Sequence, residues 1–111
     1  MIPNKELQDL AQALKRSAEY IEMMQVRRRV LENPRFGRQM LMFERERARL
    51  YSLGLQREDV AQREKKLFAD HRALLAEEEV KRFIEATHTY QNMISESIEY
   101  LNRMLEVNRS Y

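Results

Sequence analysis

The sequence predicts an all-α protein, an elongated antiparallel helical bundle of about four helices, two long and two shorter. Only two Gly and two Pro occur among 111 residues, which leaves room for few turns. Apolar residues recur at steps of three and four along most of the chain, and this is the period of an amphipathic helix. We therefore expect a single helical domain over 1–111. Its helices are predicted at about 4–31, 34–53, 57–75 and 78–108.

The first predicted helix spans 4–31. Pro3 and Asn4 supply turn and capping chemistry at its start. Its expected apolar face comprises Leu7, Leu10, Leu14, Ser17, Ile21, Met24, Arg28 and Leu31. Asn33-Pro34 ends the helix, because proline disfavours helical geometry in the residue before it. The same pair fits the cap and the first position of the next helix.

The two middle helices are predicted over 34–53 and 57–75. The first has Phe36, Met40, Phe43, Arg47 and Leu50 on one side. Gly54 fits the position just beyond its end, where a left-handed backbone favours glycine. The second is the most polar of the four, with Val60, Leu67, Leu74 and either Phe68 or His71 facing inwards. A further break is expected around 76–79, although neither Gly nor Pro marks it.

The last predicted helix, over 78–108, carries two adjoining apolar lines. Such a face is too wide for one neighbour and packs on several, within the chain or in a second copy. Self-association would also enlarge the modest core that a chain of this length can bury. We therefore predict a homo-oligomer, with a dimer favoured, that uses this helix and part of the first. The predicted partner interface consists of Phe83, Ile84, Tyr90, Ile94, Ile98, Leu101 and Leu105.

Charge is distributed unevenly although the net charge is only +2. Eight Arg face three Glu over 27–49, whereas seven Glu face four basic residues over 77–111. Opposite signs favour packing of one region on the other, within a chain or across a dimer. The alternative is a basic patch for an acidic protein or RNA. Its candidate residues are Arg27, Arg28, Arg29, Arg35, Arg38 and Arg45. RNA is less favoured because Glu32, Glu44 and Glu46 interleave and no aromatic stacking platforms lie among the arginines.

Catalytic and metal chemistry find little support. The chain has no Cys, which excludes disulfides, thiolate nucleophiles and thiolate metal sites. Glu85 and His88 have the Glu-x-x-His spacing of di-iron bundles, but Phe68 stands where a second motif with His71 would need its carboxylate. The serines lack a neighbouring His with an orienting acid, and two isolated Gly form no phosphate loop. We expect no enzyme activity, metal or cofactor.

A membrane location is not expected either. No stretch approaches the ~20 apolar residues that a spanning helix needs. The first residues also lack the basic and apolar segments of a signal peptide. The expected location is the cytoplasm.

Four segments carry a family resemblance. Residues 10–20 read LAQALKRSAEY, Asn33-Pro34 interrupts the first long helix, and 80–86 read VKRFIEA. The last helix then contributes Ile94, Ile98 and Leu105. In this order and spacing they resemble the YlbF/YmcA family (Com_YlbF, with its YheA-like members), small helical regulators of Gram-positive bacteria. The resemblance covers nearly the whole chain, and departs at Glu77-Glu78, where the family usually has Asn/Asp-Pro.

The resemblance implies a non-catalytic bacterial adaptor that binds other regulatory proteins, such as family paralogues or an endoribonuclease. It would act in RNA processing and in the control of competence, sporulation and biofilm formation. Some members work in a complex associated with iron–sulfur clusters. Without Cys this chain cannot ligate a cluster, which implies a scaffold subunit or a YheA-type paralogue. Two alternatives remain open: a direct RNA-binding module that uses 27–49, and a chaperone or secretion adaptor that holds a client in the groove of the last helix.

Overall fold

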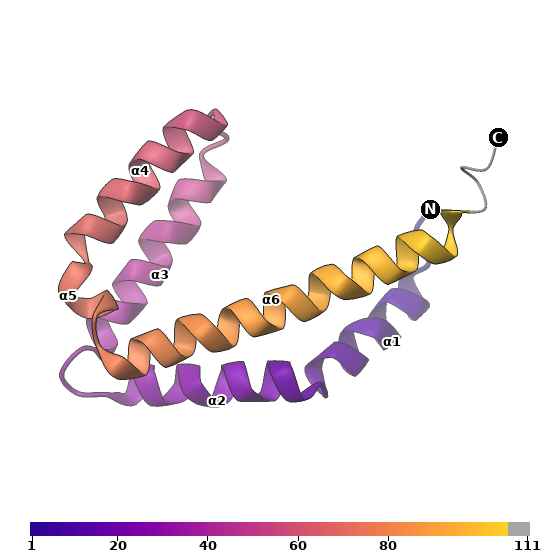
Figure 1. Ribbon diagram of the computed structural model, residues 1–111, viewed down its shortest axis with the longest axis horizontal. Helices are drawn as coiled ribbons and strands as arrows, with labels where there is room; N and C mark the ends of the chain where they lie inside the picture. Colours follow the sequence, from indigo (N-terminus) through magenta and orange to yellow (C-terminus); the bar gives the residue numbers. More distant parts are fainter. Residues whose placement is uncertain (107–111) are drawn as a thin grey trace. The chain divides into compact units, whose positions relative to one another are not determined.

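The structure, a computed structural model, describes residues 1–106 and contains six helices joined by short turns in that range (Figure 1). They are α1 (Asn4–Lys15), α2 (Ala18–Glu32), α3 (Gly37–Ser52), α4 (Arg57–Asp70), α5 (Arg72–Leu75) and α6 (Glu78–Met104). No strand occurs within the described residues, so the all-α prediction is confirmed. The prediction of about four helices is corrected to six, because two predicted helices are each interrupted. The predicted helix end at 108 lies outside the described residues.

Ser17 separates α1 from α2, where periodicity predicts one helix over 4–31. Its Oγ donates a hydrogen bond to the carbonyl oxygen of Leu14 at 2.6 Å. The same oxygen accepts the backbone N–H of Tyr20 at 3.1 Å. One hydroxyl therefore closes α1 and caps α2. The apolar stripe runs on across this break, so periodicity alone could not reveal it.

His71 separates α4 from α5, within the predicted helix over 57–75. Its backbone has φ −112° and ψ 27°, which departs from helical geometry. The imidazole is buried and meets the Phe43 ring edge-on, with 5.3 Å between centroids. Nδ1 lies 3.4 Å from Gln39 Nε2, and Nε2 lies 3.5 Å from Glu46 Oε2. Packing of this ring against α3 accounts for a break that no Gly or Pro marks.

The predicted break at Asn33-Pro34 is confirmed, but α3 begins only at Gly37. Asn33 Oδ1 accepts the backbone N–H of Arg35 at 2.8 Å, which forms a turn in place of a first helical turn. Phe36 then leaves helical geometry with φ −134° and buries its side chain. Gly37 is needed at the next position because a Cβ there would collide with the backbone carbonyl oxygen of Leu31.

The other two predicted breaks are also present. Gly54 adopts φ 67° directly after the end of α3, as predicted for a glycine in that position. The chain leaves α5 at Leu75 and enters α6 at Glu78.

No helix in the described part of the chain is both long enough and apolar enough to cross a lipid bilayer.

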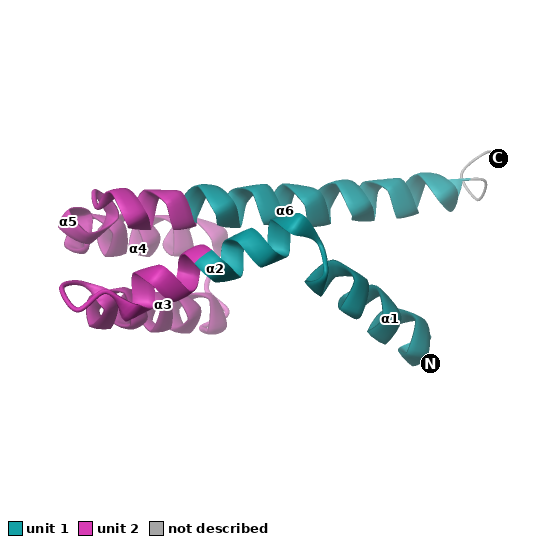
Figure 2. Cartoon of the chain, turned by 90° about the horizontal axis from the view of Figure 1, so that it is seen from below, with its two compact units in different colours: residues 1–25, 84–111 teal, residues 26–83 magenta. Residues whose placement is uncertain are grey.

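The chain divides into two compact units, shown in teal and magenta in Figure 2. Unit 1 comprises Met1–Gln25 and Ile84–Tyr111, described as far as 106, and unit 2 comprises Val26–Phe83. Every buried apolar side chain of the described residues belongs to unit 2. These residues are Val26, Val30, Phe36, Met40, Phe43, Leu50, Leu67, Leu74, Val80 and Phe83. The expectation of a single domain over 1–111 stays a prediction.

Candidate interaction surfaces

Two of the six predicted patch arginines bind acidic residues inside unit 2. Arg27 of α2 reaches Glu44 of α3, with Nη2–Oε1 at 3.0 Å and Nε–Oε2 at 3.3 Å. Arg35 binds Glu77 through two nitrogen–oxygen pairs, both at 2.8 Å. Both pairs are bidentate, the arrangement that best fixes a guanidinium group. These two arginines are therefore engaged within the chain.

The other four patch arginines are exposed and have no acidic partner among residues 1–106. They are Arg28, Arg29, Arg38 and Arg45.

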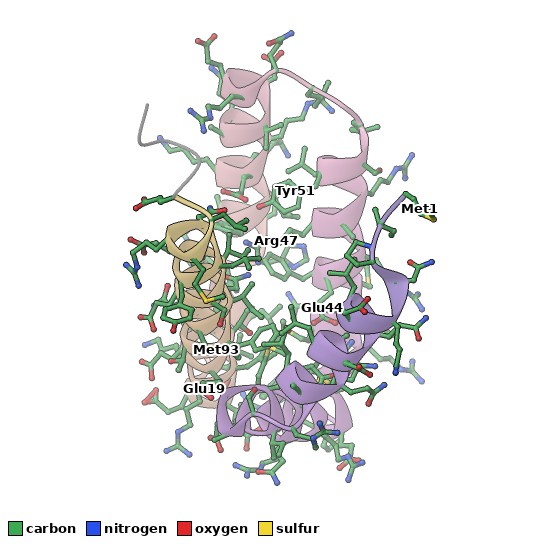
Figure 3. All side chains as sticks on the ribbon, turned by 90° about the vertical axis from the view of Figure 1, so that its right-hand side faces the viewer. Met1, Glu19, Glu44, Arg47, Tyr51 and Met93 are labelled. Atoms are coloured by element: carbon green, nitrogen blue, oxygen red, sulfur yellow. The ribbon has the colours of Figure 1, made fainter. Side chains whose placement is uncertain are left out.

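Arg47, which the sequence places on the inner side of its helix, contacts aromatic side chains (Figure 3). Its Nε donates to the Tyr51 hydroxyl at 3.3 Å, and its guanidinium carbon lies 5.6 Å and 5.8 Å from the ring centroids of Tyr51 and Phe68. The basic patch is thus smaller than the sequence predicts.

The outer face of α3 presents part of this remaining charge. Arg38 and Arg45 are seven positions apart, which puts these arginines within roughly 20° of one line along a helix of 3.6 residues per turn. Leu41 and Met42 flank the line, 36% and 55% exposed. The buried residues on the opposite side are Met40, Phe43 and Leu50. The outer face of α3 is therefore cationic with exposed apolar side chains.

The seven residues of the predicted partner interface differ in exposure along the chain. Phe83 is buried in the core of unit 2. The half-buried residues are Ile84, Tyr90 and Ile94. Tyr90 meets the ring of Tyr20 edge-on, with 5.5 Å between centroids. The exposed residues are Ile98, Leu101 and Leu105, at 54%, 46% and 54%. The structure thus leaves the end of α6 and the turn after it as the open part of the predicted interface.

Unit 1 exposes further apolar side chains that the sequence places on an inward face. Leu7, Leu10, Ile21 and Met24 are 40–47% exposed, and Met104 is 59% exposed. No residue of α1 is buried. The stripe identifies these residues as apolar and aligned, but periodicity does not reveal whether a partner helix is present in the same chain.

The candidate metal motif gains no further ligands. Glu85 and His88 are exposed, and the described residues contain no group of three or more His, Cys, Asp or Glu able to hold a metal ion. The buried His71 contacts Glu46, Gln39 and Phe43, and none of these three side chains carries a hydroxyl group.

Comparison with protein families agrees with the motifs in the sequence. The model of a family described as control of competence regulator ComK, YlbF/YmcA, matches residues 4–106. The match includes all six helices and the three segments at 10–20, 33–34 and 80–86. Searches of curated proteins and of solved structures gave no match.

Proposed function

Because the chain belongs to the YlbF/YmcA family of competence regulators, we propose that it is a non-catalytic regulatory adaptor of the cytoplasm. It acts by binding other proteins and by pairing with a second copy of itself. One observation carries this proposal: unit 1 has no buried side chain in its described residues, yet its helices are amphipathic. Large exposed apolar surface on a small protein is typical of an interaction site.

The exposed apolar residues of unit 1 provide the interface between copies. They are Leu7, Leu10, Ile21, Met24, Ile98, Leu101, Met104 and Leu105, each 40–59% exposed. A standard interface buries about 800 Å² on each partner. Eight large, half-exposed side chains offer an area of that order. In a two-fold dimer the same residues of both copies would meet, so one set of side chains serves both sides.

Charge reversal within this set tests the dimer. I98E/L101E in the full chain is expected to convert a dimer into a monomer, because four carboxylates would enter an apolar interface. Light scattering coupled to size exclusion gives the mass, and circular dichroism checks that helicity is kept. M42E is the matched control, since Met42 is equally exposed but belongs to unit 2. A dimeric I98E/L101E protein, or a wild type that stays monomeric at high concentration, would contradict the proposed interface.

The exposed arginines of unit 2 supply the contact to other proteins. We expect a triple reversal of Arg28, Arg38 and Arg45 to Glu to abolish partner recruitment and to leave folding intact, because none of the three is in an ion pair among residues 1–106. The assay is a pull-down of tagged protein from a lysate of its own source, with and without ribonuclease, read by mass spectrometry. Partners that survive nuclease and are lost from the variant support the adaptor role. Unchanged recruitment by the variant would remove this surface from the proposal.

Direct RNA binding is the second candidate, supported by the same four unpaired arginines. Arginine suits phosphate because its planar group donates hydrogen bonds in pairs. An RNA-binding module would show an affinity for a labelled single strand that falls steeply with salt, with a log–log slope of about −0.7 per phosphate contacted. The triple reversal would flatten that slope. Absence of binding at low salt excludes this candidate.

A further inference from the structure

A groove of about 640 Å³ runs along the hairpin of α3 and α4 in unit 2. Each bank repeats the spacing i, i+3, i+4, i+7, beginning at Glu46 on α3 and at Arg63 on α4. This spacing keeps the lining side chains on one face of each helix. The groove is therefore bounded by two regular, antiparallel ridges and is open to solvent.

The floor of the groove is aliphatic. Leu50 and Leu67 form it from the two helices and are only 7% and 8% exposed. Leu53 extends it beyond the end of α3 and is 49% exposed. An apolar floor between two helical ridges fits the apolar face of a third helix, the mode in which many partner proteins recognise an amphipathic segment.

The rim has a charge imbalance that selects the occupant. Lys66 Nζ lies 3.1 Å from Asp70 Oδ2, so these two residues neutralise each other. Glu46 Oε2 lies beside the buried imidazole of His71. Arg49 and Arg63, one on each bank, have no acidic partner within residues 1–106. The lining therefore carries three basic and two acidic side chains, and bidentate pairing of Arg49 and Arg63 with carboxylates of a ligand would satisfy both guanidinium groups.

We propose that this groove binds an acidic amphipathic helix of a partner protein. The apolar side chains of that helix rest on Leu50, Leu53 and Leu67, and its carboxylates pair with Arg49 and Arg63. The inference rests on the proposed adaptor function and names the chemistry of the segment that the adaptor recognises. A helix fits better than RNA because the groove is lined without aromatic side chains, on which single-stranded bases stack.

The test is a selection of peptides that bind the full-length protein. A displayed library of helical peptides, balanced in acidic and basic residues, is panned against the wild type and against R49E/R63E. The wild type is expected to enrich peptides with Asp or Glu beside a stripe of Leu, Ile or Met. R49E/R63E is expected to enrich Lys and Arg at the same positions. A peptide selected on the wild type should bind R49E/R63E at least tenfold more weakly.

R57E/K65E is the matched control. It makes the same change of charge at two exposed residues of α4, and neither residue lines the groove or belongs to the arginines proposed to contact other proteins. Its affinity for the selected peptide should stay within twofold of the wild type. Identical peptide pools from wild type and R49E/R63E would overturn the proposal, and so would equal losses in R49E/R63E and R57E/K65E. Stronger binding of a single-stranded RNA oligonucleotide than of any peptide, lost in R49E/R63E, would also overturn it.

A third variant, I98E/L101E, distinguishes the groove proposal from the self-association proposal. The selected peptide is expected to bind I98E/L101E with unchanged affinity, because both substitutions lie in unit 1 and the groove lies in unit 2. That result supports the groove whether or not the wild type is a dimer. Loss of peptide binding in I98E/L101E, with helicity kept, would contradict a site formed by α3 and α4 alone.

Discussion

Unit 2 and unit 1 are built from the same kind of amphipathic helix, yet in the described residues only unit 2 buries side chains. Unit 2 has breaks at Asn33-Pro34 and at Gly54, and the turn at Gly54 brings α3 against α4. The described part of unit 1 contains no glycine, and none of its side chains is buried. An apolar stripe therefore specifies which face of a helix can be buried, whereas a turn at the right position in the chain supplies the helix that covers that face.

Matched leucines in the two units give the largest expected contrast. Leu74→Ala should lower the free energy of unfolding by about 2–5 kcal/mol, because Leu74 is 1% exposed and its loss leaves a cavity. Leu101→Ala should cost within about 0.5 kcal/mol in dilute protein, since Leu101 is 46% exposed. Urea unfolding followed by circular dichroism measures both. Equal costs in dilute protein would remove the distinction between the units.

The same pair also connects stability with assembly. If a second copy covers unit 1, the cost of Leu101→Ala should grow as protein concentration rises, because association stabilises the folded state by mass action. The cost of Leu74→Ala should change little over that range. A Leu101→Ala cost that is independent of concentration would argue against Leu101 as an interface residue.

The two glycines of the chain provide a test of packing density in unit 2. Gly37→Ala should cost about 1–3 kcal/mol, because the new Cβ meets the backbone of Leu31, which cannot move aside as a side chain would. Gly54→Ala should cost about 1 kcal/mol through its φ of 67° alone, since nothing lies within 4 Å of the added atom. Thermal and urea unfolding rank the two. A larger cost at Gly54 would contradict the close approach at Gly37.

Ion pairs give the smallest expected difference between the units. Arg35–Glu77 in unit 2 is bidentate, whereas Arg103–Glu99 in unit 1 is an exposed i, i+4 contact at 3.5 Å. Glu77→Gln should cost up to about 1 kcal/mol and Glu99→Gln about 0.3 kcal/mol, because exposed pairs contribute little. Double-mutant cycles with the partner arginines isolate each interaction. The two costs should also converge at high salt, and a persistent cost at Glu77 would assign it to packing.

The sequence predicts those parts of the fold that depend on local chemistry. Asn33-Pro34 and Gly54 mark breaks through proline geometry and left-handed backbone, and both are present. The break at His71 depends on Phe43, 28 positions earlier, and no local signal announces it. The break at Ser17 did have a signal, a serine with an acidic residue two positions later, which the continuous stripe concealed.

The two candidate surfaces stay predictions, and the structure changes which of their side chains are exposed. The arginine-rich region and the apolar face of α6 stand out by composition and period. Arg27 and Arg35 are withdrawn from the patch by Glu44 and Glu77, 17 and 42 positions away, and such pairings follow from tertiary packing. Phe83 shares the stripe of α6, but it lies in unit 2 and is buried in the core of that unit.

The interruption at Ser17 bears on the lifetime of the protein. It leaves α1 as a helix of 12 residues, a length that is marginal for an isolated helix in water, and no side chain of α1 is buried. An unassembled copy therefore offers a segment that opens easily and invites proteolysis. We expect surplus copies to be degraded from this segment, so that the abundance of the protein follows the supply of whatever covers α1.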